Sequence, residues 1–242
     1  MTERIGKRPR TVSNAEIGLA LIGVGLAAAV AFTVALLGHD LGLESLWSAI
    51  AVVGVLAATV WILHRLSVGY DEPRYGALLT VAILVKAAAA AAQYAVTSMI
   101  YDGRADAAKY HELGALVASS IRNGSYEAYE YGSQATTNLV TIVGWIYAVV
   151  GTSRVGGIAL FTAMSLIGAF LFDRAVRRAA PGLDLWRYSV LIYLVPTVMF
   201  WPSTIGKDAW MMLMIGIVTN GFSLLVASSA RWSGIAWVAV GV

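Results

Sequence analysis

Long apolar runs constrain this chain more than any other feature of its sequence. They lie at about residues 17–37, 46–63, 76–100, 156–172 and 210–226. A helix needs roughly 20 apolar residues to cross the hydrocarbon core of a bilayer. Because 59% of the 242 residues are hydrophobic and only 13% are charged, the runs exceed what a soluble core requires. The sequence therefore predicts an all-α fold, a polytopic bundle of transmembrane helices.

Basic residues are concentrated at a few points along the chain and set its expected orientation. The N-terminal tail, residues 1–14, holds one group of them: Arg4, Lys7, Arg8 and Arg10. Because positively charged segments stay in the cytoplasm, we expect a multi-pass protein of the cell membrane with a cytoplasmic N-terminus. The first apolar run is too long for the core of a signal peptide, so we expect it to be retained as a helix.

This order of segments predicts three parts. Residues 1–14 form the basic cytoplasmic tail, and residues 15–75 form two transmembrane helices with their connections. Residues 76–242 form the rest of the membrane module, with an outer loop at 101–137 that is expected to fold into short surface helices. The last apolar run stops after about eight residues, at 235–242, so we expect the chain to be truncated.

Residues 138–150 are the ambiguous part of this topology. The apolar stretch is only about 13 residues long, which suits a short crossing or a half-helix that returns to the same side. Arginines after the run at 156–172 favour the cytoplasm for its end. That orientation requires a half-helix at 138–150, an outward helix at 188–201, and the segment 202–208 on the same face as Asp102.

Composition excludes two classes of function. The chain has no cysteine, so it forms no disulfide and has no thiolate nucleophile or cysteine-ligated metal. Its net charge of +3 is small, and it has no stripe of basic and aromatic side chains that would track a nucleic acid. We therefore expect no nucleic-acid partner.

A polar cluster directly follows the run at 76–100. If it is helical, Asp102, Asp106 and Tyr110 lie at successive four-residue steps on one face. Lys109 is spaced to pair with Asp106. One carboxylate could act as a base while the other orients it. The alternative is a solvated helix start, with its acids near the positive end of the helix dipole.

A second polar segment, Trp201–Asp208, lies between two apolar helices. Charged groups at such a depth are costly unless they face protein, water or a ligand. Lys207 could hold a phosphate as a point charge, with the N-terminus of the next helix as a further donor. The alternative is a plain boundary, at which Pro202 breaks one helix and Asp208 caps the next.

Lys86 is a third unusual residue, because it lies in the middle of the run at 76–100. It is about 16 residues before Asp102, or roughly 24 Å along a helix, too far to join the same site directly. We expect its charge to snorkel to the surface or to find a buried partner.

The two polar segments contain motifs whose order resembles that of a known family. Asp106-x-x-x-Tyr110-His111-x-x-Gly114, after an apolar helix with a cation in mid-span, is similar to the first catalytic loop of membrane glycosyltransferases of the GT-C superfamily. Phe200-Trp201-Pro202-Ser203-x-x-Gly206-Lys207-Asp208 is similar to the second polar site of bacterial members related to family 39, which includes protein mannosyltransferases and aminoarabinose transferases. The resemblance covers about residues 84–226. The family normally begins with the helix that feeds the acidic loop, so the two helices ahead of it here would be an N-terminal extension. Its members have many more helices overall, so the resemblance implies that this chain is an N-terminal fragment.

The resemblance implies a GT-C-like bundle that transfers a sugar from a polyprenyl-phosphate donor, at the outer face of the membrane, to a glycan, lipid or protein acceptor. Asp102 or Asp106 would bind or deprotonate the acceptor hydroxyl, and Asp106 matches the pattern better. Lys207 would stabilise the departing lipid phosphate. Asp208 would match the second acid of the family.

The same resemblance implies the lining of the site. Tyr110 and His111 would lie beside the substrate, and Arg104 or Lys109 could share the phosphate role. Some relatives hold Mg²⁺ or Mn²⁺ between such acids and others do not, so a divalent cation stays an open possibility.

A transporter or flippase subunit for a lipid-linked sugar is the alternative function. It would bind the same head group without chemistry, and it would need polar groups along a path through the bilayer. Such groups are sparse apart from Lys86, Gln93 and Asn220, so the sequence favours the enzyme.

Overall fold

The computed structural model describes residues 43–67, 73–101, 105–127, 129–227 and 231–241. Every regular element in these ranges is a helix, as the sequence predicts. The helices are α2 (Leu43–Ser67), α3 (Pro73–Met99), α4 (Asp106–Arg122), α5 (Gln134–Val150), α6 (Arg154–Ala179), α7 (Trp186–Leu194), α8 (Pro196–Phe200), α9 (Lys207–Val226) and α10 (Arg231–Gly241). The basic tail at 1–14 and the apolar run at 17–37 lie outside the described residues.

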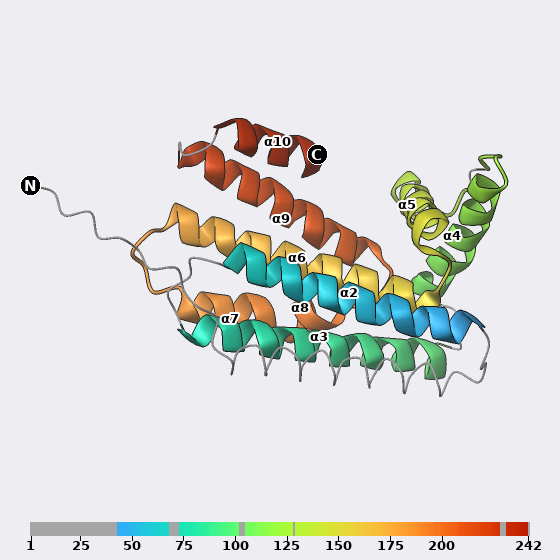
Figure 1. Cartoon of the computed structure of the whole chain (residues 1–242), viewed down its shortest axis with the longest axis horizontal. Helices are drawn as coiled ribbons and strands as arrows, with labels where there is room; N and C mark the ends of the chain where they lie inside the picture. The colour runs from blue at the N-terminus through green and yellow to red at the C-terminus, as the bar shows by residue number, and fades with distance from the viewer. Residues whose placement is uncertain (1–42, 68–72, 102–104, 128, 228–230, 242) are drawn as a thin grey trace, which may run out of the picture.

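Three of these helices, α3, α6 and α9, are long and apolar enough to cross a membrane. They coincide with the apolar runs at 76–100, 156–172 and 210–226. The apolar stretches of α2 (Ile50–Arg65), α5 and α10 are shorter. Figure 1 shows α2, α3, α6 and α9 running alongside one another, with α10 packed on α9.

Helices α6 and α9 approach until their backbones touch. A Cβ atom on Gly168 would meet the backbone of Met212, and one on Gly216 would meet the backbone of Gly168. Small residues allow such a close approach between membrane helices, which are then held by dispersion contacts. A larger side chain at either glycine would push α9 away from α6, together with Lys207 at its first turn.

Helices α4 and α5, with the segment 123–133 that doubles back between them, form a unit at one end of the bundle that we call the hairpin (Figure 1). This is the end at which α3 finishes and at which α6 and α9 begin. Helices α4 and α5 run in the same direction, since Arg122 at the end of α4 donates a hydrogen bond to the Tyr147 carbonyl near the end of α5. Residues 138–150 belong to α5, a continuous helix of 17 residues that packs mainly along α4. The surface helices expected at 101–137 reduce to α4, since the described chain between Asn123 and Gly132 is irregular.

Helix α6 continues past the charged residues that were expected to end it. It runs to Ala179, and Asp173 is completely buried. The carboxylate of Asp173 pairs with Arg177 at 3.1 Å. It also accepts hydrogen bonds from the hydroxyls of Tyr75 at 2.5 Å and Ser189 at 2.6 Å. Because its charge is compensated inside the bundle, the helix need not end there.

The segment between α6 and α9 contains a broken helix. The single helix predicted at 188–201 is wrong, because α7 ends at Leu194 and α8 restarts at Pro196. Proline has no N–H for the helical ladder and drives the preceding residue to extended backbone. Val195 accordingly has a ψ of 125°, and α8 in turn ends before Pro202.

Lys86 satisfies the end of α8. Its side chain is 2% exposed, and its ammonium donates hydrogen bonds to the carbonyl oxygens of Val198 at 2.9 Å and Met199 at 3.2 Å. In a continuing helix the Val198 carbonyl would accept from the N–H of residue 202, which Pro202 lacks. A cation at a helix C-terminus is also favoured by the helix dipole. Of the two outcomes expected for Lys86, the structure has the buried partner.

Asp173→Ala is expected to destabilise the protein by about 3–5 kcal/mol, because it removes the buried carboxylate on which two hydroxyls and Arg177 converge. The matched control is Arg174→Ala in the same helix turn, which should change stability by about 0.5 kcal/mol or less. Denaturant unfolding of the purified chain in detergent measures both. Equal losses in the two variants would contradict the assigned role of Asp173.

Lys86→Met is expected to cost about 1–3 kcal/mol, because it leaves the buried Val198 carbonyl without its donor, while the Met199 carbonyl keeps the Ser203 hydroxyl. Pro202→Ala restores an N–H that can bond to the Val198 carbonyl. Lys86→Met should therefore cost less in the Pro202→Ala background than in the natural one, which a four-protein unfolding series would show. Strictly additive losses would argue against capping of α8 by Lys86.

Candidate functional site

Helix α4 presents one apolar stripe to α5. Its buried residues recur at the spacing of one helix face: Ala107, Tyr110, Gly114, Val117 and Ala118. At Gly114 an added Cβ atom would collide with the side chain of Val143 in α5. The two helices are therefore closely packed, and this packing fixes the position of the first turn of α4.

An apolar cluster joins the hairpin to the bundle. Its buried members come from four parts of the chain: Tyr110, Val117 and Ala118; Leu139, Val140, Val143 and Tyr147; Ile158 and Phe161; and Ile205 and Ala209. The last two flank Lys207, so their burial holds the first turn of α9 against the hairpin. Segments far apart in the sequence meet here because they share one core.

Asp106 is an exposed residue in the first turn of α4, where the helix dipole favours a carboxylate. It accepts a hydrogen bond from the Tyr131 hydroxyl at 3.1 Å. The ring of Tyr131 meets that of Tyr110 edge-on, with the centroids 6.0 Å apart. This tyrosine pair orients a carboxylate that is still open to solvent.

Tyr110 is buried next to this pair. Its side chain is 2% exposed, and its hydroxyl has no hydrogen-bond partner among the residues that the structure describes. Burial raises the pKa of Tyr110, the negative charges of Asp106 and Asp208 raise it further, and the neighbouring Thr136 hydroxyl, which does not meet hydrogen-bond geometry, lowers it. A buried polar group without a partner costs free energy. Here it lies within the influence of two carboxylates from distant parts of the chain.

Lys207 lies over the first turn of α5. Its Nζ donates a hydrogen bond to the Thr136 hydroxyl at 3.1 Å, and Thr136 in turn shares a hydrogen bond with Ser133 at 2.9 Å. Asp208 follows and is exposed. The ammonium and the N-terminus of α5 both attract negative charge, so this point suits an anionic group of a substrate.

His111 and Tyr147 form a second polar pair in the same hairpin. The Nδ1 atom of His111 is 3.0 Å from the Tyr147 hydroxyl, and the rings meet edge-on. Burial lowers the pKa of His111, and the positive charge of Arg154 lowers it further. The imidazole is therefore neutral at neutral pH. Burial raises the pKa of Tyr147, so its hydroxyl keeps its proton.

Lys109 does not pair with Asp106 as its spacing suggested. It pairs instead with Glu112 at 2.9 Å, which is equally three residues away, while the carboxylate of Asp106 is already bonded to a tyrosine. Both partners of this pair are well exposed, so it adds little stability. Asp102 and Arg104 lie outside the described residues.

Three residues of the site were not predicted from the sequence: Tyr131, Thr136 and Tyr147. Tyr131 reads as an interfacial aromatic residue, and a threonine at the start of a helix is common. Tyr147 lies in an apolar stretch, where a tyrosine needs a partner for its hydroxyl when it is buried. This requirement indicates that Tyr147 has a polar partner, but it does not show that the partner is His111.

A divalent cation has no evident site in this part of the chain. The described residues contain no group of three or more acids or histidines that could hold a metal ion. Asp106 and Asp208 are two carboxylates near the Tyr110 hydroxyl, and two carboxylates are fewer ligands than a protein site for a divalent cation usually has.

Comparison with known proteins identifies no relative of this chain. No family model, no curated protein and no solved structure matches it. The functional proposal rests on the residues and their geometry.

His111 is expected to titrate below about 6.5, the ordinary histidine pKa. The folded chain then binds fewer protons than the unfolded one, so stability falls as the pH drops from that value through the pKa of the folded state. NMR titration in a His39→Gln, His64→Gln background measures it. Arg154→Gln should raise the pKa, and His111→Gln should remove the stability change. A folded-state pKa at or above 6.5 would overturn the assignment of a buried, neutral His111.

Proposed function

We propose that this chain is an integral membrane glycosyltransferase with a GT-C-like bundle, which transfers a sugar from a polyprenyl-phosphate donor to an acceptor hydroxyl at the outer face of a cell membrane. The observation that carries the proposal is that Asp106, bonded to Tyr131, and Lys207, bonded to Thr136, lie beside one apolar cluster that contains Tyr110 and the residues flanking Lys207. Asp106, Tyr110 and Lys207 are among the positions whose order in the sequence resembles that family.

Asp106 is the base of the proposed reaction. Its carboxylate is exposed, and the Tyr131 hydroxyl at 3.1 Å holds it in one orientation. An acceptor hydroxyl bound beside it donates its proton to the carboxylate as the oxygen attacks the anomeric carbon of the sugar. A positioned general base of this kind contributes about 10²–10⁴-fold to a rate.

Lys207 stabilises the leaving group. As the new glycosidic bond forms, the bond between the anomeric carbon and the phosphate oxygen breaks, and the lipid phosphate leaves with the bonding electron pair. The ammonium of Lys207 and the N-terminus of α5 both lie where that negative charge would be bound. The products are the glycosylated acceptor and the polyprenyl phosphate, with the acceptor proton on Asp106.

The remaining polar residues would position the sugar. The buried hydroxyl of Tyr110 stays protonated and supports the site from beneath, beside Thr136 and near the carboxylates of Asp106 and Asp208. The neutral imidazole of His111 has its Nε2 atom for a hydrogen bond to the sugar, since its Nδ1 faces Tyr147. Asp208 can accept hydrogen bonds from sugar hydroxyls. A site of hydroxyls, a neutral imidazole and carboxylates suits a carbohydrate better than an apolar ligand.

Asp106→Asn and Lys207→Gln are each expected to lower transfer by at least about 10²-fold, because the first removes the base and the second the charge that stabilises the phosphate. The assay is transfer from polyprenyl-phosphate-linked hexoses and pentoses by membrane vesicles that contain the full chain. Glu130→Gln, an exposed acid of the same hairpin, is the matched control and should keep full activity. Near-normal transfer by a variant with both site changes would refute the proposal.

A further inference from the structure

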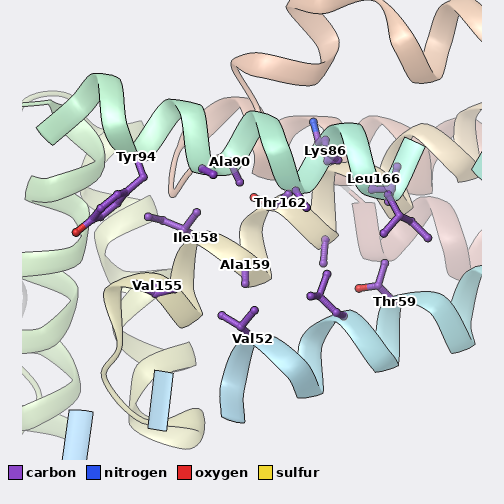
Figure 2. Close-up of a pocket in the computed structure, with 15 residues that line it drawn as sticks. Val52, Thr59, Lys86, Ala90, Tyr94, Val155, Ile158, Ala159, Thr162 and Leu166 are labelled. Atoms are coloured by element: carbon purple, nitrogen blue, oxygen red, sulfur yellow. The ribbon is translucent and has the colours of Figure 1, made fainter. Parts of the chain in front are cut away.

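A narrow apolar groove lies between α2, α3 and α6 (Figure 2). Its cavity volume is about 80 Å³. The wall on α3 is made of alanines, including Ala87, Ala90 and Ala91, which leave the helix surface flat. Val52 of α2 and Ile158 of α6 line the facing walls. The groove therefore lies between two of the helices that can cross a membrane, α3 and α6.

Lys86 and Tyr94 both line the α3 wall of the groove, roughly 12 Å apart along the helix. The ammonium of Lys86 points out of the groove to the carbonyls of Val198 and Met199 (Figure 2), whereas Tyr94 lies at one end of the groove. The guanidinium of Arg154 stacks over the Tyr94 ring, 5.2 Å from its centroid.

The guanidinium of Arg154 makes no ion pair with any acid in the described part of the chain. Arg154 is the first residue of α6, so it lies where a membrane-crossing helix reaches the head groups. Arginine binds phosphate through a fork of N–H donors, and stacking on an aromatic ring leaves that fork available. Charge complementarity thus indicates an anion at this mouth of the groove.

We propose that the groove binds one hydrocarbon chain of an anionic membrane phospholipid, one with a net negative charge, whose phosphate lies against Arg154 beside Tyr94. The chain fills the apolar space along the alanines of α3, and the phosphate stays at head-group depth. This site is distinct from the sugar-transfer site of Lys207, and it holds whether or not the chain transfers sugars.

The occupied site would also act on the neighbouring hairpin. The charge of Arg154 lowers the pKa of His111, whereas Glu112 raises it. A phosphate bound at Arg154 offsets the positive charge, so the pKa of His111 should rise when the lipid binds. The histidine thus reports occupancy of the groove in the natural chain, without any substitution in the groove itself.

The test is thermal unfolding of the full chain in a neutral detergent with added dioleoylphosphatidylglycerol. At a hundredfold excess over Kd, the midpoint should rise by roughly 5–10 °C. Dioleoylphosphatidylcholine and inorganic phosphate should not reproduce the shift, because the first lacks the net negative charge and the second lacks the chain. An equal shift with either one would overturn the proposal.

Matched variants locate the effect. Ala91→Leu fills the groove and Arg154→Gln removes the cation, so both should abolish the shift. Ala88→Leu, on the exposed side of the same alanine run, and Arg187→Gln, an exposed arginine, should keep it. Retention of the shift in both groove variants would sink the proposal. If Ala91→Leu fails to fold, the smaller Ala91→Val replaces it, and the titration of His111 in the natural chain gives a second test. An unchanged pKa of His111 on adding the anionic lipid would contradict the proposed lipid site.

Discussion

The broken helix between α6 and α9 is the constraint on which the rest of the structure depends. Backbone polar groups in a bilayer must be satisfied within the protein, and Pro196 and Pro202 each remove a donor from the ladder. Lys86 supplies the missing donor at the end of α8, and the Ser203 hydroxyl donates to the Met199 carbonyl. The chain can therefore leave helical geometry while it is still buried.

This local solution decides where α9 begins. Because the chain is released from the helix at Pro202, the buried Ile205 can enter the apolar cluster of the hairpin. Lys207 then lies against Thr136 instead of continuing along the bundle. The close contact of Gly168 with α9 fixes the other face of that helix. Lys86, through the end of α8, and the contact of Gly168 with Gly216, through α9, therefore both determine where Lys207 lies.

The sequence predicted those parts of the fold that the bilayer itself dictates. Helices α3, α6 and α9 lie at the apolar runs, since length and hydropathy are set by membrane thickness. It failed where a partner lies on another helix. Asp173 reads as a surface charge because nothing near it in the chain shows that Tyr75 and Ser189 converge on it. Pro196 marks the helix break in the sequence itself, although the apolar residues around it favour a continuous helix.

Some residues of the candidate site could be predicted from the sequence, and others could not. Motif order pointed to Asp106 and Lys207, since charged residues at membrane depth demand an explanation. The contribution of α5 was hidden, because Thr136 and Tyr147 acquire their roles only when the connection after α4 returns to Asp106 and α5 packs along α4 in the same direction. That hairpin depends on close packing at Gly114, and no residue pattern short of the packed structure shows it.

The central claim is that the first turn of α4 and the chain before α9 share one face of the membrane. Single cysteines at Ala105, Thr204 and Ala179 in this cysteine-free chain test it directly. In sealed vesicles of one orientation, a membrane-impermeant maleimide should label positions 105 and 204 from the same side and position 179 from the other. Labelling of 105 and 204 from opposite sides would contradict the account.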